Sequence, residues 1–273
     1  MITEPGTYPH LSDEDYHADP ALGSTGLRNV LRSPLTYYSK HLDPNRPKAE
    51  PTAAMVAGTL THLLLLQPDR FHEQYTVRPS WVDGRKADGK EWLAANKDRI
   101  ILTEEQMHVA EGQVASIKAK PMVYALFEGC QSELPMFWRD PETGVLCKIK
   151  PDSIKQAGGG VVLADLKTTS DASPAGFSKS AGALGYHIQQ SFYCEGYEAV
   201  TGVPVIGFVF VAVSNEYPYD CAMYMLDDVA ESHGKLKVRQ ALNAYAKCKA
   251  DGVWPGFGSD IKTLSLPPWT LKD

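Results

Sequence analysis

The chain has 273 residues, of which 43% are hydrophobic and 22% are charged, as is ordinary for a soluble globular protein. Its formal net charge of −6 argues against a protein that coats nucleic acid indiscriminately, but a nuclease needs only a locally basic groove. No apolar stretch is long enough to span a bilayer, and the N-terminus lacks the segments of a signal peptide. Five scattered cysteines indicate reduced thiols in a cytoplasm. The sequence has no internal repeat or Ser/Gly-rich linker, so we expect one domain over residues 1–273, with no membrane partner.

The first part of the chain is expected to be mainly helical. A helix capped by Ser24 or Thr25 should end before Pro34, because a residue that precedes proline avoids helical backbone angles. Residues 52–71 have the composition of a second, mostly buried helix, which contains His62.

The segment 78–99 is polar and rich in lysine, and we expect it to form a loop and a short helix that are the most mobile part of the chain. Beyond it, Thr103 and Gln106 have the spacing of a capping box, which predicts the start of a third helix. Pro121 interrupts that helix.

The second part of the chain changes to β character. Residues 132–138 and 145–152 predict a hairpin with Gly144 at its bend, and a glycine run then leads into an apolar strand. The elements expected next are that strand at 159–168, a helix at 186–200, strands at 205–213 and 220–226, and a long helix at 228–250. This order predicts an α/β (α+β) fold in which helices flank a mixed β-sheet.

The apolar strand ends in a carboxylate and an ammonium group, those of Asp165 and Lys167. Alternate residues of a strand point to the same face, so these two side chains lie together. By the same rule Lys148, Lys150 and Asp152 share a face of the preceding strand. The two aspartates, on adjacent strands, can therefore converge on one hard cation such as Mg²⁺, which prefers oxygen ligands.

The carbonyl of Leu166 is a further candidate oxygen ligand, and Lys167 is placed to orient a metal-bound water or to stabilise transition-state charge. The alternative is a solvated ion pair at the end of a strand, which is the usual meaning of an isolated Asp-x-Lys. A single histidine such as His62 is likewise more often a core residue than a ligand. Gln189 and Tyr193, four residues apart on the next helix, are by themselves more typical of packing.

In their order along the chain, these residues form a series that resembles the PD-(D/E)xK nucleases. Pro-Asp is followed by Asp-Leu-Lys, "GTLTHLLLL" resembles the histidine helix of the RecB-like and RecE-like branches, and "QQSFY" contains their Gln-x-x-x-Tyr element. "YHADPALGSTGLRNVLRSPLTYY", "WRDPETGVLCKIKPD" and "IKTLSLPPW" are similar to the nuclease domain of RecE, exonuclease VIII of prophage recombination systems. The similarity extends from Tyr16 to Trp269.

The resemblance implies a restriction-endonuclease-like core and a metal-dependent exonuclease that degrades the 5′-ended strand of linear double-stranded DNA. The product would be a 3′ single-stranded tail for an annealing protein of the RecT type, in a bacterial or phage-infected cell. Related proteins form rings around DNA, which implies a toroidal homo-oligomer, a trimer or a tetramer. Two alternatives stay open: a RecB-like nuclease of other polarity or single-strand preference, and a non-catalytic protein that binds DNA ends.

Carried over to this sequence, the resemblance implies a Mg²⁺ site in which Mn²⁺ is a substitute. The implied metal ligands are His62, Asp152, Asp165 and the backbone carbonyl of Leu166. Lys167 matches the catalytic lysine, and Gln189 and Tyr193 match the helper motif. Glu133 lies where related nucleases place an additional acidic residue, although a glutamate on a surface strand is an equal alternative.

Two sets of basic residues are candidates for DNA binding. Lys148 and Lys150 would form a short basic stripe that leads into the metal site, unless this face of the hairpin is simply solvated. Arg28 and Arg32, on the helix that begins near Ser24, could bind a terminal 5′-phosphate, whereas an ordinary capped surface helix is the alternative.

Basic residues elsewhere carry weaker indications. Arg85 and Lys86 in the mobile segment are candidate contacts to the DNA backbone. Lys235, Lys237 and Arg239 are expected to form a solvated face of the last helix.

Overall fold

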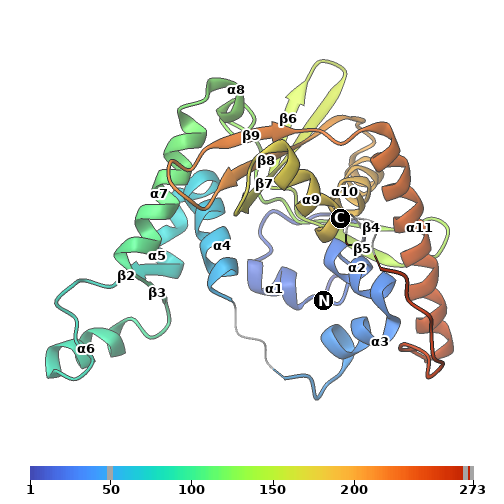
Figure 1. Cartoon of the computed structure of the whole chain (residues 1–273), viewed down its shortest axis with the longest axis horizontal. Coiled ribbons are helices and arrows are strands. Elements are labelled where there is room, and N and C mark those ends of the chain that lie inside the picture. The colour runs from blue at the N-terminus through green and yellow to red at the C-terminus, as the bar shows by residue number, and fades with distance from the viewer. Residues whose placement is uncertain (48–51, 267–269, 271–273) are drawn as a thin grey trace.

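Three hydrogen-bonded sheets organise the protein. Figure 1 shows the arrangement of its helices and strands in a computed structural model, which describes residues 1–47, 52–266 and 270. The last three residues of the sequence "IKTLSLPPW" lie outside the described residues. The strands are β1 (Gly6–Thr7), β2 (Tyr75–Val77), β3 (Ile100–Leu102), β4 (Met136–Arg139), β5 (Leu146–Ile149), β6 (Ser153–Ala157), β7 (Gly160–Thr169), β8 (Val205–Ser214) and β9 (Cys221–Tyr224). They form the sheets β1-β4-β5, β2-β3 and β6-β7-β8-β9.

Helices connect these sheets and cover the largest one. They are α1 (Asp13–Ala18), α2 (Ser24–Arg32), α3 (Pro34–Tyr37), α4 (Ala53–Leu66), α5 (Phe71–Gln74), α6 (Ala87–Ala95), α7 (Glu104–Lys118), α8 (Pro121–Tyr124), α9 (Pro174–Leu184), α10 (Tyr186–Thr201) and α11 (Asp228–Asp251). A π-helix at Tyr38–Leu42 follows α3, and a 3₁₀-helix at Pro68–Arg70 precedes α5. The predicted α/β (α+β) arrangement, a mixed sheet flanked by helices, is confirmed.

The central four-stranded sheet is mixed. Its two ten-residue strands, β7 and β8, are parallel, and the edge strands β6 and β9 pair with them in antiparallel fashion. Parallel neighbours need a crossover connection, which α9 and α10 provide. β6 and β7 are joined at the predicted glycine turn, where Gly159 has a φ of +91° that other residues rarely adopt.

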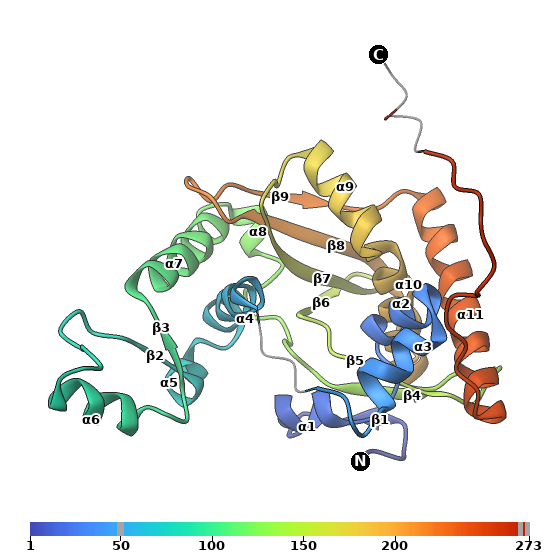
Figure 2. The same ribbon diagram turned by 60° about the horizontal axis from the view of Figure 1, so that its bottom comes forward.

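Alternate residues of β7 pack against different helices. Ala164 and Leu166 belong to a buried cluster with Leu65 of α4 and with residues of α7. Leu163 belongs to the cluster on the opposite face, together with Phe192 of α10. Figures 1 and 2 show α4 and α7 on one side of the sheet, and α9, α10 and α11 on the other. Helices thus cover both faces of the strand that carries the Asp-Leu-Lys sequence.

The outer edge of β7 extends beyond its partner strand. β6 begins at Ser153, opposite Ala164, whereas β7 continues to Thr169. The backbone of Leu166 lies on this extension, and buried backbone groups require hydrogen-bond partners. At this edge, side chains rather than a neighbouring strand bind the N–H and the carbonyl of Leu166. These side chains form part of the candidate active site.

The predicted strand 145–152 is divided between two sheets. β5 ends at Ile149 and pairs with β4, whereas β6 belongs to the central sheet. Pro151 lies between them, and proline lacks the N–H group that a continuous ladder needs. The expectation that Lys148 and Asp152 share one strand face is therefore wrong, and Asp152 lies in the connection immediately before β6.

Two helix predictions also need correction. α2 begins at Ser24 with Gly23 as its N-cap and has no side-chain cap, so the expected cap by Ser24 or Thr25 is wrong. α9 was not expected, although Ser173 caps it. The capping box of Thr103 at the start of α7 is confirmed. Among the described helices, none is long and apolar enough to cross a membrane.

Candidate active site

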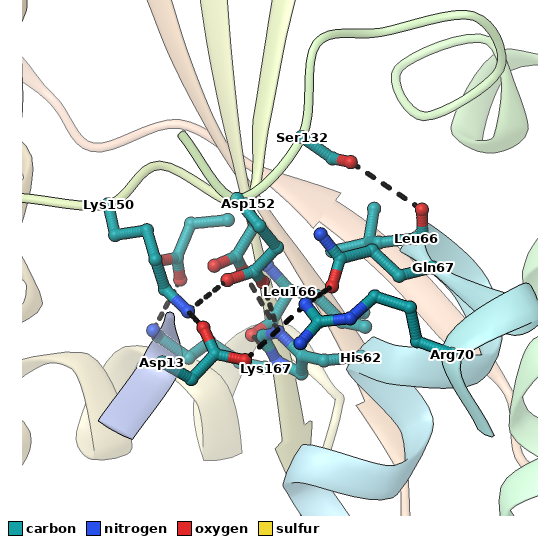
Figure 3. Close-up of polar contacts among 12 residues, drawn as sticks. Asp13, His62, Leu66, Gln67, Arg70, Ser132, Lys150, Asp152, Leu166 and Lys167 are labelled. Carbon is teal, nitrogen blue, oxygen red and sulfur yellow. Dashed lines mark hydrogen bonds and ion pairs between the residues drawn. The ribbon is translucent and has the colours of Figure 1, made fainter. Parts of the chain in front are cut away.

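The free edge of β7 brings three chain segments together at Leu166. The N–H of Leu166 donates to Asp152 Oδ2 over 2.7 Å, and its carbonyl oxygen lies 3.0 Å from His62 Nε2. The other ring nitrogen of His62, Nδ1, lies 3.4 Å from Asp152 Oδ2. Figure 3 shows His62 of α4 and Asp152 of the β5–β6 connection meeting at this backbone.

Glu133 completes this group from the connection before β4. Its Oε1 lies 3.9 Å from His62 Nδ1, and its Oε2 lies 2.6 Å from Lys150 Nζ. Its φ of +52° is uncommon for a residue other than glycine, so the local backbone is held in an unusual conformation. One ligand atom each from His62, Glu133 and Asp152 lies within 4.8 Å of the others. Glu133 is therefore part of the site rather than a glutamate on a surface strand.

Asp165 and Lys167 form a buried ion pair beside this group. Asp165 is 2% exposed, and its Oδ2 pairs with Lys167 Nζ. Its Oδ1 accepts a 2.6 Å hydrogen bond from Gln189 Nε2 of α10. Lys167 Nζ also lies 5.0 Å from the centre of the Tyr186 ring. α10 therefore holds both members of the pair, which favours an ordered site over a solvated strand end.

The second half of the predicted helper motif, Tyr193, lies one turn further along α10 and packs against Phe208. Burial, and then the charges of Asp165, Asp152 and Glu133, raise the pKa of Tyr193 well above its usual range. The hydroxyl group therefore stays protonated and neutral beside the carboxylates.

Crowded charges shift the pKa values of the site. Burial alone would lower the pKa of His62, but Asp152 and Glu133 raise it to about 9. Burial, together with the charges of Asp165 and Glu133, raises the pKa of Asp152 to about 7 against the opposing effect of His62. Burial would raise the pKa of Glu133, yet His62 and Lys150 lower it to about 2. Burial and neighbouring carboxylates thus disfavour the charged form of Asp152, whereas His62 and Lys150 stabilise the charged form of Glu133.

The donor set fits a small divalent metal ion. Carboxylate and carbonyl oxygens are the ligands that suit Mg²⁺ and Mn²⁺. One ligand atom each of His62, Glu133 and Asp152 lies within 4.8 Å of the others, and the Leu166 oxygen is hydrogen-bonded to His62 Nε2 beside them. His62, Glu133, Asp152 and the Leu166 carbonyl would therefore hold the ion. Asp165 remains a predicted ligand, since its oxygens are engaged by Gln189 and Lys167.

A cavity of about 320 Å³ opens onto this group. Its lining includes His62, Glu133 and Lys150 of the site, together with Asp13 and Tyr75. The candidate ligands His62 and Glu133 are therefore accessible from this cavity.

The expected basic stripe of Lys148 and Lys150 does not lie on the surface. Lys148 is 8% exposed, and its ammonium group donates to the carbonyls of Tyr16 and Asp19 and lies 4.7 Å from the Tyr16 ring centre. Burial lowers the pKa of Lys148 to about 8. Lys150 forms ion pairs with two carboxylates. Strand alternation could not show that the segment around α1 covers β5, so the prediction of an exposed stripe was wrong.

Two residues of the site were missed from the sequence. Asp13, in the acidic first turn of α1, lies 2.7 Å from Lys150 Nζ and 3.6 Å from a guanidinium nitrogen of Arg70 (Figure 3). Tyr186, the first residue of the predicted helix 186–200, covers Lys167. The acidic first turn of α1 was a sequence feature that could have indicated Asp13. An aromatic residue at the start of a helix is common, so nothing in the sequence indicated Tyr186.

Among the described residues, the remaining predicted DNA contacts form no hydrogen bond or ion pair with the candidate metal ligands. Arg28 donates to the Leu184 carbonyl, and Arg32 is exposed near the end of α2. Ser24 lines another cavity, of about 430 Å³. Segment 78–99, which contains the candidate contacts Arg85 and Lys86, carries α6 and extends away from the central sheet in Figure 1. Arg85 pairs with Asp83 over 3.0 Å, and Lys86 is the N-cap of α6.

Comparison with known proteins places this geometry in context. Residues 23–265 match the family described as "PDDEXK-like domain of unknown function (DUF3799)". The chain resembles the crystal structure of a "putative exonuclease" from Eubacterium rectale with a TM-score of 0.58 and 15% identity, over 96% of this chain and 98% of that one. The structure of SSO0001 aligns over 80% and 82% at 15% identity with a TM-score of 0.29, too low to inform the fold. No curated protein matches the sequence.

Proposed function

Because the chain belongs to the PDDEXK-like family DUF3799, we propose that it is a metal-dependent exodeoxyribonuclease acting on linear double-stranded DNA. It would remove the 5′-ended strand in the 5′→3′ direction and leave 3′ single-stranded tails for recombination by strand annealing. The observation that supports this most is the convergence of His62, Asp152 and the Leu166 carbonyl beside the buried Asp165–Lys167 pair. An end-binding protein without activity would not need this arrangement.

The proposed chemistry divides between the metal and the residues of the chain. A bound divalent cation would supply Lewis acidity and an activated water. His62, Glu133, Asp152 and the Leu166 carbonyl would hold it. Lys167 would bring a fixed positive charge to the phosphate in the transition state.

The positioning of Lys167 rests on its neighbours. Burial would lower the pKa of Lys167, but the charges of Asp165 and Asp152 raise it, so the amine stays protonated. Gln189 fixes Asp165, and Tyr186 limits the motion of the ammonium group. A charge that is already in place costs little reorganisation when the phosphate reacts.

The polarity and the partners of the enzyme are proposals drawn from the resemblance to RecE. A toroidal homo-oligomer, a trimer or tetramer, would hold the duplex during digestion, and a RecT-type protein would anneal the tail. Mg²⁺ would be the working metal, with Mn²⁺ as its substitute, and the enzyme would act in the cytoplasm of a bacterial or phage-infected cell.

A linear duplex with different labels on its 5′ and 3′ ends tests this function. With Mg²⁺, the 5′ label should be released first as a small product while the 3′ label stays on the single-stranded tail, and EDTA should stop the release. A covalently closed circle of the same sequence is the matched control and should stay intact. Early release of the 3′ label would assign the opposite polarity, and an intact linear duplex would contradict a nuclease.

A further inference from the structure

A second, basic groove lies beyond the first turn of α10. It has a volume of about 810 Å³ and lies between α2, the α9–α10 junction and α11. In Figures 1 and 2 these helices lie together on the same side of the central sheet. The basic and imidazole side chains of its lining are Arg28, Arg32, Lys40, His187, His233 and Lys237.

Charge is distributed very unevenly around this groove. The chain has 33 acidic and 27 basic residues, yet no aspartate or glutamate is among the described residues that line the groove. None of its four arginine and lysine side chains forms an ion pair with a carboxylate in the described part of the chain. The groove is thus a locally positive surface on a chain with an excess of negative charge.

On α11, a basic residue that lines the groove lacks an ion pair among the described residues, whereas two basic residues near it that do not line the groove form one. Lys235 pairs with Glu231 over 2.6 Å, and Arg239 pairs with Asp140 over 2.9 Å. Lys237, which lies between them in sequence and lines the groove, has only the Gln240 amide oxygen at 3.1 Å as a hydrogen-bond partner in the described structure. The three residues do not form one solvated face as the sequence predicted, because Lys235 is exposed whereas Arg239 is only 28% exposed and pairs with the buried Asp140.

The first turn of α10 connects the groove to the candidate active site. Gly185 and His187 line the groove, whereas Tyr186 covers Lys167 and Gln189 bonds Asp165. A Cβ atom on Gly185 would lie 3.0 Å from Cδ of Arg28, so glycine lets this arginine pass close to the helix start. No side chain caps α10, and the N–H groups of Ile188 and Gln189 donate to the Gly185 carbonyl.

We propose that this groove binds the phosphodiester backbone of duplex DNA next to the site of hydrolysis. Unpaired arginine and lysine side chains are the main ligands of DNA phosphates, and such contacts carry no sequence information. The described lining has no phenylalanine, tyrosine or tryptophan on which bases of a single strand would stack. The inference rests on the proposed nuclease function and adds to it the path of the substrate.

The environment of His187 agrees with an anion site. Burial, and then the positive charges of His233 and Lys237, lower the pKa of His187. A phosphate bound between these groups would relieve the repulsion between them.

Salt-dependent binding tests the groove without any catalysis. Binding of a labelled blunt duplex is measured in EDTA by fluorescence anisotropy at several salt concentrations, for the parental protein and for Arg32→Gln/Lys237→Gln. Each lost phosphate contact should make the slope of log K against log salt less negative by about 0.9. The double variant should therefore bind more weakly, with a slope smaller by up to about 2 in magnitude.

Lys247→Gln is the matched control, because Lys247 is also on α11 but is 79% exposed and pairs with Asp251. It should keep the parental affinity and slope. If the groove variant also kept both, or if a single strand bound more tightly than the duplex, the assignment of the groove to duplex DNA would be overturned. A groove variant with weaker binding and a smaller slope, together with parental protein that leaves the duplex intact in Mg²⁺, would support the groove and contradict the nuclease. No binding at all would overturn the groove.

Discussion

Asp165 and Lys167 form an ion pair near the end of β7. A pair at an exposed strand end would contribute little, whereas this pair is buried and its carboxylate is bonded by Gln189. Removing one partner of a buried pair leaves an uncompensated charge, which is strongly destabilising. Asp165→Asn/Lys167→Met removes both charges with little change of shape, and so it separates loss of function from loss of folding.

The raised pKa of His62 gives a prediction about the pH dependence of stability in the metal-free protein. The pKa of His62 is about 9 in the fold, above its ordinary value of 6.5. The stability that its protonation contributes is therefore complete below pH 6.5 and is lost as the pH rises through 9. Calorimetry in EDTA should show that the Tm difference between parental protein and His62→Gln decreases from pH 6.5 to pH 9. A difference that grows over this range would contradict the assigned environment.

At the scale of elements, the sequence correctly predicted the helix starts, turns and strands that depend mainly on residues close together in the chain. The capping box of α7, the glycine turn between β6 and β7 and the apolar strands β7 and β8 were all predicted within one to two residues. The division of 145–152 between two sheets was not predicted, because it depends on which strands are available as partners. His62 and Asp152 could be named as candidates, whereas their contact at Leu166 follows from the unequal lengths of β6 and β7.

Close packing of α10 on β4 gives a prediction at this scale. A Cβ atom on Gly196 would lie 2.5 Å from Trp138 Cζ3, and Trp138 is 2% exposed. Gly196→Ala should therefore lower the free energy of unfolding by about 1–3 kcal/mol. Gly182→Ala is the control, since no described atom lies within 4 Å of its Cβ position on α9, and alanine there should keep or raise the stability. Equal urea midpoints for the two variants would contradict this packing.

For the whole molecule, the restriction-endonuclease-like core expected from the sequence is confirmed. The net charge of −6 gave no indication of the basic groove, because the carboxylates that make the chain acidic lie outside the groove. Sequence periodicity also misjudged the lysines: Lys148 is buried under the segment around α1, and Lys237 is left unpaired in the groove. The partners of long side chains depend on tertiary contacts, so these two assignments required the structure.

The most direct test is nucleotide release from a linear duplex in Mg²⁺ by parental protein and by Asp165→Asn/Lys167→Met. Lys247→Met serves as the control for loss of a lysine, and thermal melting verifies that all three proteins are folded. The parental protein and the control should release nucleotides at equal rates, and EDTA should stop both. The double variant should be slower by roughly a hundredfold or more, the usual effect of losing transition-state charge stabilisation. Release by the folded double variant at the parental rate would contradict the placement of the active site at the end of β7.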